Sequence, residues 1–128
     1  MYRMAAYLSA RCASDAACLG TQVSLDVARQ LVRAVSSVTA NIAEGCSRNG
    51  TADRLRFYTY ALGSVREALA WIDALGAAPW PPRDDYRDLL VQIRRQLLVA
   101  IKSMRAKRRL PRTPAHSRRP VADPNPES

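Results

Sequence analysis

The chain has 128 residues, of which 48% are hydrophobic, and its formal net charge is +9. This length allows one domain with a modest core, and no apolar run approaches the roughly 18 residues of a membrane-spanning helix. Three sparse cysteines and a single histidine, without metal-type spacing, argue against a zinc site and a disulfide framework and favour a reducing cytoplasm.

The positive charge is unevenly distributed along the chain. Residues 1–101 hold twelve basic and nine acidic groups, whereas residues 102–128 hold eight basic and two acidic groups. Eighteen of the twenty basic residues are arginine, whose planar guanidinium suits phosphate and bases. The arginine bias therefore favours nucleic acid as a partner, although a genome rich in G and C would explain it equally well.

The apolar residues recur at spacings of three and four, which predicts helices and no strand. We expect the first helix over residues 2–18, with Gly20 as its stop signal. Its short apolar stripe consists of Met4, Tyr7, Leu8 and Cys12. The N-terminus is interrupted by arginines, so we interpret it as part of the fold and not as a signal peptide.

The second helix is expected to begin after Ser24, which is a good N-cap. Its apolar face starts at Leu25 and runs to Ile42 in steps of three and four. The helix should stop between Gly45 and Gly50, where an Asn-Gly pair predicts a turn.

The third helix has the most regular pattern in the chain. We expect Thr51 to cap it and Gly76 to end it. Gly63 within it costs about 1 kcal/mol relative to alanine, and the close approach of a neighbouring helix would offset this cost. The seam advances by three and four through Leu55, Tyr58, Leu62, Val65, Leu69 and Ile72.

A proline-rich loop at residues 79–82 precedes the fourth helix, and we expect its Trp80 to pack over the end of the bundle, with exposure as the alternative. Acidic residues near the start of the fourth helix and basic residues near its end suit the helix dipole. Residues 110–128 include five prolines and few apolar residues, so a disordered tail is predicted after a bundle of residues 1–109. The stripe of the fourth helix is Tyr86, Leu90, Ile93, Leu97, Ile101 and Met104.

Two basic groups are candidates for nucleic-acid contacts. One surrounds the turn between the second and third helices, and the other begins late in the fourth helix and continues into the tail. A basic run without an aromatic RNA-recognition pattern predicts affinity for phosphate without base readout; a solvated face and a solubilising tail are the alternatives. The candidates are Arg48, Arg54, Arg56, Lys102, Arg105, Lys107, Arg108, Arg109, Arg112, Arg118 and Arg119.

Asn41 and Glu44 share a helix face, and we interpret both as structural. A buried carboxylate needs a partner, for which Arg66 and then Arg54 are the nearest candidates, and Asn41 could satisfy backbone groups at the helix end. No nucleophile, base and orienting group are recognisable as a set. We therefore expect a protein that is not an enzyme and that needs neither metal nor cofactor.

Three motifs occur in order on three expected helices. They are Asn41-Ile42-Ala43-Glu44-Gly45, Ala61-Leu62-Gly63-Ser64-Val65-Arg66-Glu67 and Ile101-Lys102-Ser103-Met104. Over residues 24–107 the chain resembles the four-helix-bundle family of 23S ribosomal RNA intervening-sequence proteins, which is similar in design to the accessory proteins of diversity-generating retroelements. The short first helix and Cys46, where an aromatic residue is common, depart from the family pattern.

The resemblance implies an all-α, antiparallel four-helix bundle that assembles into a ring-like pentamer with a basic surface. It implies a cytoplasmic accessory protein that binds RNA, with DNA as a second candidate ligand. The expected protein partner is a reverse transcriptase, and no association with a membrane is expected. The alternative is a self-assembling structural bundle without a specific nucleic-acid partner. The motif residues expected to be structural are Asn41, Glu44, Gly45, Gly63 and Arg66.

Overall fold

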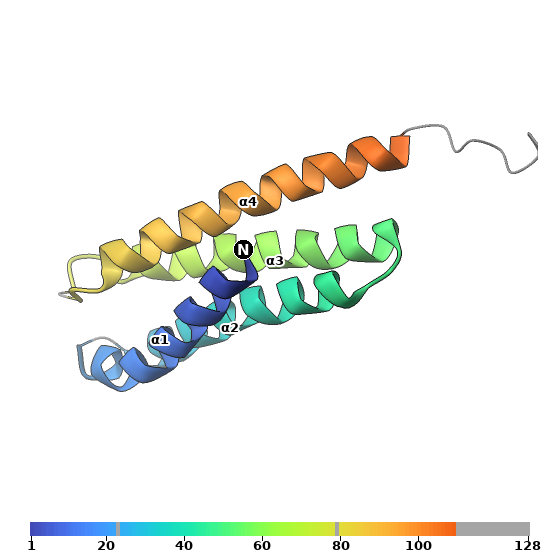
Figure 1. Cartoon of the computed structure of the whole chain (residues 1–128). Helices are drawn as coiled ribbons and strands as arrows, with labels where there is room; N and C mark the ends of the chain where they lie inside the picture. Colours follow the sequence, from blue (N-terminus) through green and yellow to red (C-terminus); the bar gives the residue numbers. More distant parts are fainter. Residues whose placement is uncertain (23, 79, 110–128) are drawn as a thin grey trace, which may run out of the picture.

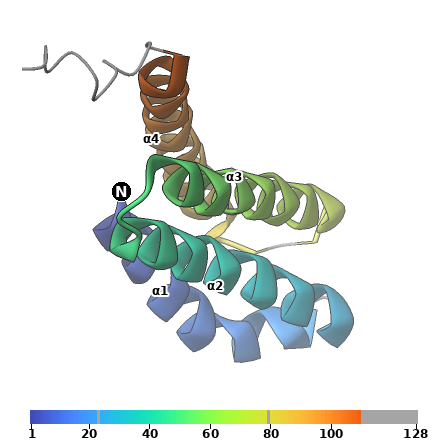
Figure 2. The ribbon, with the colours of Figure 1, turned by 90° about the vertical axis from the view of Figure 1, so that its right-hand side faces the viewer.

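The computed structural model describes residues 1–22, 24–78 and 80–109, which form four helices and no strand (Figure 1). The helices are α1 (Tyr2–Gln22), α2 (Leu25–Ser47), α3 (Thr51–Ala74) and α4 (Arg83–Arg109). Consecutive helices run in opposite directions and pack side by side, while α1 and α4 make the least extensive contact (Figure 2). The expected antiparallel four-helix bundle is confirmed.

The core is formed by one apolar stripe from each helix. All six residues expected in the stripe of α4 are buried, from Tyr86 to Met104. The seam of α3 is also confirmed, although Leu55 and Leu69 are only partly buried and Ala61 and Ala68 add to it. These stripes close the bundle because apolar side chains three and four residues apart lie on the same helix face.

The expected stripes of α1 and α2 each include a residue that lies outside the core. Tyr7 of α1 is 56% exposed and Leu25 of α2 is 54% exposed. Ala5 and Leu19 are buried in α1 instead, and Ala34 is buried in α2. Small alanines allow the helices to approach closely, and a pattern that counts only large side chains misses them.

The helix ends confirm some of the expected signals and contradict others. Ser24 caps α2, with its hydroxyl accepting a hydrogen bond from the Asp26 N–H at 3.2 Å. Gly20 does not stop α1, which continues to Gln22, because one helical glycine costs only about 1 kcal/mol and the burial of Leu19 favours continuation.

Glycines flank the third helix on both sides, Gly50 before it and Gly76 after it. The N-cap of α3 is Gly50, without a side-chain cap bond, and Thr51 is the first helical residue instead of the cap. After the last helical residue, Ala74, Gly76 adopts a φ of +57°, the left-handed conformation that glycine tolerates best. The expectation that Gly76 terminates the helix is therefore confirmed.

Polar contacts connect α1 to α2 and α4. Thr39 donates a hydrogen bond to the Ala5 carbonyl at 2.8 Å, and the Tyr86 hydroxyl donates to the Asp15 carboxylate at 2.9 Å.

Trp80 is 5% exposed and lies against the Tyr86 ring, with centroids 4.7 Å apart. The expected packing of Trp80 over the bundle end is thus confirmed.

Helix α1 covers only part of the bundle. It begins well short of the turn between α2 and α3, so the end of the molecule that contains this turn consists of α2, α3 and α4 (Figure 1).

Of the four described helices, none has an apolar stretch long enough to cross a lipid bilayer.

Candidate nucleic-acid interface

The antiparallel arrangement brings the two basic groups of the sequence to the same end of the bundle. Helices α3 and α4 diverge toward this end (Figures 1 and 2). The hollow between them is lined by Leu55 of α3 and by Arg105, Arg108 and Arg109 of α4. We define the basic end as Arg48, Arg54, Arg56, Lys102, Arg105, Lys107, Arg108 and Arg109.

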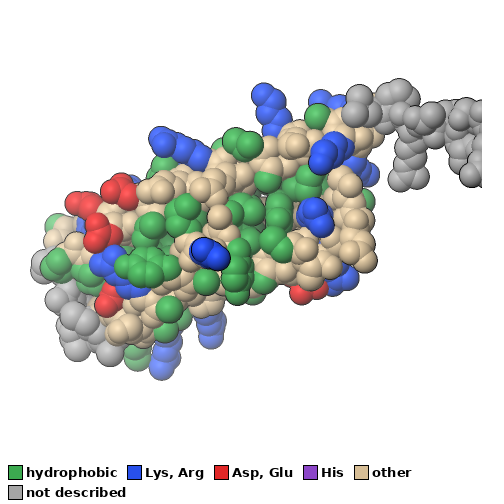
Figure 3. Space-filling model, in the orientation of Figure 1, with side chains coloured by type: hydrophobic (Ala, Val, Ile, Leu, Met, Phe, Trp, Pro, Cys, Tyr) green, Lys and Arg blue, Asp and Glu red, His purple; other side chains and the backbone are tan. Residues whose placement is uncertain are grey.

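The charge of the basic end is largely uncompensated. Its eight basic residues are accompanied by two acidic ones in the segments 44–57 and 102–109, Glu44 and Asp53. Each of these acids pairs with an arginine close in sequence, Glu44 with Arg48 and Asp53 with Arg56. On the face shown in Figure 3, acidic side chains gather mainly at the opposite end, where α4 begins.

Two of the arginines have structural roles. Arg48 forms an ion pair with Glu44, and its guanidinium carbon lies 5.0 Å from the centre of the Phe57 ring. Arg54 donates a hydrogen bond to the Arg48 carbonyl at 2.9 Å, which closes the turn between α2 and α3. Both side chains are half-buried, so they shape the basic end more than they extend from it.

The prediction that Glu44 pairs with Arg66 or Arg54 is wrong. Glu44 pairs with Arg48, four residues later on the same helix, and with neither Arg66 nor Arg54. Residues four apart lie on one helix face within easy reach, whereas Arg66 is exposed on the outer side of α3. Glu44 is itself half-buried and does not lie in the core.

The other basic side chains are available to a ligand. Arg56 is exposed beside Asp53 at 3.6 Å, and the described residues of the α4 group, Lys102, Arg105 and residues 107–109, are all exposed. Arg112, Arg118 and Arg119 lie outside the described residues, as does the whole expected tail.

The remaining motif residues have different surroundings. Asn41 donates to the Ser37 carbonyl at 2.9 Å, so it satisfies a group within α2 and not at the helix end. A Cβ on Gly45 would lie 2.6 Å from the Tyr58 ring, whereas one on Gly63 would meet nothing within 4 Å. The close helix approach that we expected at Gly63 therefore occurs at Gly45.

Cys46 and Tyr58 form a pair of ionisable side chains close to the turn between α2 and α3. The Cys46 sulfur lies 3.2 Å from the Tyr58 hydroxyl. Burial, assisted by this contact, raises the pKa of Tyr58 from about 10 to about 12. Within residues 1–22, 24–78 and 80–109, no three His, Cys, Asp or Glu side chains are close enough to hold a metal ion.

Two aromatic residues beside the basic end, Phe57 and Tyr60, were not among the predicted site residues. The centre of the Phe57 ring lies 5.0 and 5.1 Å from the guanidinium carbons of Arg48 and Arg56. Tyr60, one turn later, packs edge-to-face on Phe57 with centroids 6.0 Å apart and is 53% exposed. The available signal was the position of Tyr60, which follows Arg56 by four residues and Phe57 by three, spacings that make residues neighbours on a helix surface.

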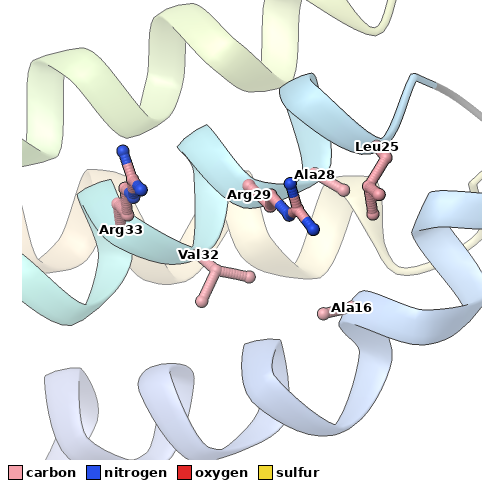
Figure 4. A pocket seen from close by; sticks show the side chains of 6 residues that line it. All are labelled: Ala16, Leu25, Ala28, Arg29, Val32 and Arg33. Atoms are coloured by element: carbon pink, nitrogen blue, oxygen red, sulfur yellow. The ribbon is translucent and has the colours of Figure 1, made fainter.

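A second surface feature lies between α1 and α2, away from the basic end. It is a mostly apolar groove lined by Ala16, Leu25, Ala28 and Val32, with Arg29 and Arg33 at its margin. Figure 4 shows Val32 directed toward α1 and Ala16 directed toward α2. The groove exposes apolar surface and has much less positive charge than the basic end.

Comparisons with known proteins agree with this architecture. The model of the 23S rRNA-intervening sequence protein family matches residues 1–101 and thus includes α1, which the motif resemblance over residues 24–107 had left out. A similar solved structure is a protein of unknown function from the S23 ribosomal protein family of Bacteroides thetaiotaomicron. It superposes with a TM-score of 0.70 at 19% identity, covering 79% of this chain and 97% of that chain, a likeness of fold alone. Among curated proteins no match was found.

Proposed function

The chain belongs to the 23S rRNA-intervening sequence protein family, and from this premise we propose that it is a non-enzymatic module that binds nucleic acid. Its basic end holds the phosphates of the bound strand, and RNA is the first candidate ligand. Arginine and lysine side chains that neutralise phosphates release counterions, which favours binding without reading the sequence.

One observation carries this proposal: the convergence of two basic segments, distant in sequence, at one end of the bundle. Arg56 of α3 and Arg105 and Arg108 of α4 are exposed there. The last turn of α4 also carries the negative end of its helix dipole, which favours the cations attached to it. The opposite end carries most of the acidic groups on the visible face (Figure 3), so an approaching strand is oriented toward the basic end.

The proposal is tested with two variants that remove the same charge. The basic-end variant carries Arg105→Gln and Arg108→Gln, and the control variant carries Arg29→Gln and Arg33→Gln; all four side chains are exposed. We expect the basic-end variant to bind a fluorescent single-stranded RNA about tenfold more weakly, because each lost phosphate contact weakens binding. The control variant should bind like the wild type, and equal losses in both variants would contradict a localised site.

The partner protein is a further part of the proposal. We propose that the nucleic-acid-bound module acts as an accessory to a reverse transcriptase of a diversity-generating retroelement, as the resemblance of the three motifs implies. The test is co-purification of the tagged full chain from its host, with nuclease treatment and high-salt washes. Recovery of a reverse transcriptase with one defined RNA supports the accessory role, and recovery of the chain alone contradicts it.

A structural role as a self-assembling bundle is the second candidate, and exposed apolar side chains favour it. Leu98 is 43% exposed and Val99 is 71% exposed on the outer side of α4. We propose that copies of the chain cover them in an oligomer, with five copies as the resemblance implies. Light scattering should then show a multiple of the chain mass that falls with Leu98→Gln and Val99→Gln. A wild-type mass of one chain at every concentration would exclude the assembly.

A further inference from the structure

Tyr60 is the outermost member of a cluster of aromatic and cationic side chains beside the basic end. Its ring packs edge-to-face on Phe57, with an angle of 88° between the ring planes. The Phe57 ring already has the guanidinium groups of Arg48 and Arg56 5.0 and 5.1 Å from its centre. Phe57 is half-buried by these neighbours, whereas Tyr60 is 53% exposed.

One side of the Tyr60 ring is left uncovered by the helix itself. Side chains on a helix lean toward its N-terminus, so the ring leans toward Phe57. The next residue along the same face is Gly63, which is exposed and has no atom within 4 Å of the place where a side chain would begin. The ring therefore borders open space on the side toward Gly63.

The fold does not explain why this pair of residues is present. The core of α3 is supplied by its other face, including Tyr58, Leu62 and Val65. Tyrosine and glycine both have a lower helix propensity than alanine, so neither favours the helix at an exposed position. Arg56 lies one turn before Tyr60 on the same face, and residues four apart on a helix have Cβ atoms about 5–6 Å apart.

We propose that Tyr60 stacks on an unpaired base of the bound nucleic acid while Arg56 and the rest of the basic end hold the adjoining phosphates. This inference rests on the proposed nucleic-acid binding and narrows its ligand to a single strand. Base stacking on an aromatic side chain tolerates any sequence, but a base inside a duplex is already stacked and its face is not available. The site thus distinguishes single from double strands without distinguishing sequences.

The test compares four proteins with two RNAs. The proteins are the wild type, Tyr60→Leu, the rescue variant Tyr60→Phe and the matched control Tyr7→Leu, which removes a similarly exposed tyrosine from α1. The RNAs are a single strand of about 20 nucleotides, longer than the usual site of a small binding fold, with a central 2-aminopurine, and the blunt duplex of the same length. Affinity and 2-aminopurine quenching are both measured at one salt concentration.

We expect Tyr60→Leu to weaken single-strand binding about tenfold and leave duplex binding unchanged, because a stacked base contributes to affinity at roughly this level. The wild type and Tyr7→Leu should quench 2-aminopurine, and Tyr60→Leu should not. The rescue variant Tyr60→Phe, which keeps a ring, should behave like the wild type.

Two results overturn the stacking role while leaving phosphate binding at the basic end intact. One is an equal effect of Tyr60→Leu on both RNAs, including no effect on either, and the other is wild-type binding without quenching. If the wild type binds neither RNA, the proposed nucleic-acid function itself is contradicted, and the stacking role is contradicted with it.

Discussion

Two glycines of the family-like motifs have opposite surroundings. Gly45 is buried against the ring of Tyr58, and a methyl group there would lie 2.6 Å from two ring carbons. The ring is itself buried and cannot swing aside easily. Gly63 is exposed, with open space where its Cβ would be. The first glycine is required by packing within the chain, and the second is not.

This contrast predicts opposite effects of the same substitution. Gly45→Ala should destabilise the fold by about 2 kcal/mol, because an extra carbon in a packed contact forces displacement. Gly63→Ala should stabilise it by about 1 kcal/mol through helix propensity. Urea unfolding of the two variants measures both effects, and a Gly63→Ala variant as unstable as Gly45→Ala would contradict the open surroundings of Gly63.

The buried ionisable groups predict how stability depends on pH. Burial raises the pKa of Cys12 from about 9 to about 11, and burial also raises that of Tyr58 from about 10 to about 12. Each folded pKa lies above the unfolded one, so the folded state keeps its protons longer. The stabilisation that these two groups provide is fully present below about pH 9 and is lost as the pH rises through 9 to 12.

The measurement is the thermal midpoint between pH 7 and pH 11. We expect a plateau to about pH 9 and a decline above it, which should be smaller for Cys12→Ala than for the wild type when each is compared with its own value at pH 7. A constant midpoint up to pH 11 would contradict the burial of these groups. Tyr86, whose pKa is also raised by burial and by its bond to Asp15, contributes in the same direction.

At the scale of helices, α1 contacts the rest of the bundle much less extensively than α2 or α3 does. It packs along α2 but makes only limited contact with α4. The bond from Tyr86 to Asp15 and the ion pair of Arg11 with Asp85, at 3.2 Å, hold this contact together. Elements with few buried contacts open at lower free energy than the core, so α1 should exchange its amide hydrogens before α3 does.

Removing one hydroxyl tests this attachment. Tyr86→Phe deletes the bond to Asp15 but keeps the ring in the core, so it should cost about 1 kcal/mol and speed amide exchange mainly in α1. The matched control is Tyr58→Phe, which deletes the contact with Cys46 at the other end and should leave exchange in α1 unchanged. Equal acceleration in both variants would mean that α1 is not held through Tyr86.

The helices and their buried faces were largely predictable because spacings of three and four are local. All six stripe residues of α4 are buried as expected. The errors arose where a local signal competed with tertiary packing: Gly20 did not end α1, and Ala5 and Leu19 are buried in α1 where Tyr7 had been expected. A stop signal of about 1 kcal/mol is easily outweighed by burial of a neighbouring side chain, here that of Leu19.

The candidate site was predictable as residues but not as a surface. Arg56 and Arg105 are predictable one by one as basic residues, but only the antiparallel arrangement of α3 and α4 brings them to the same end. Glu44 was expected to pair with a residue of α3, although it pairs with Arg48 at the C-terminal end of α2. Tyr60 lies outside the predicted seam of the third helix, but only the structure shows its ring packed on Phe57 beside the basic end.

At the scale of the whole molecule, charge is divided between the two ends of an elongated bundle. The basic end comprises the turn between α2 and α3 and the end of α4, and α1 begins well short of it (Figure 1). Acidic side chains gather where α4 begins, on the face shown in Figure 3. A chain with net charge +9 thus concentrates positive charge at one end instead of presenting a uniformly basic surface, and this is the end at which we propose that phosphates bind.

The salt dependence of single-stranded RNA affinity tests this account most directly. The logarithm of affinity should fall linearly with the logarithm of salt concentration, with a slope of about −0.7 for each phosphate neutralised. The basic-end variant Arg105→Gln, Arg108→Gln should reduce the slope by about 1.4, and the control variant Arg29→Gln, Arg33→Gln should keep the wild-type slope. Equal reduction in both variants, or none in either, would contradict a phosphate site at the basic end.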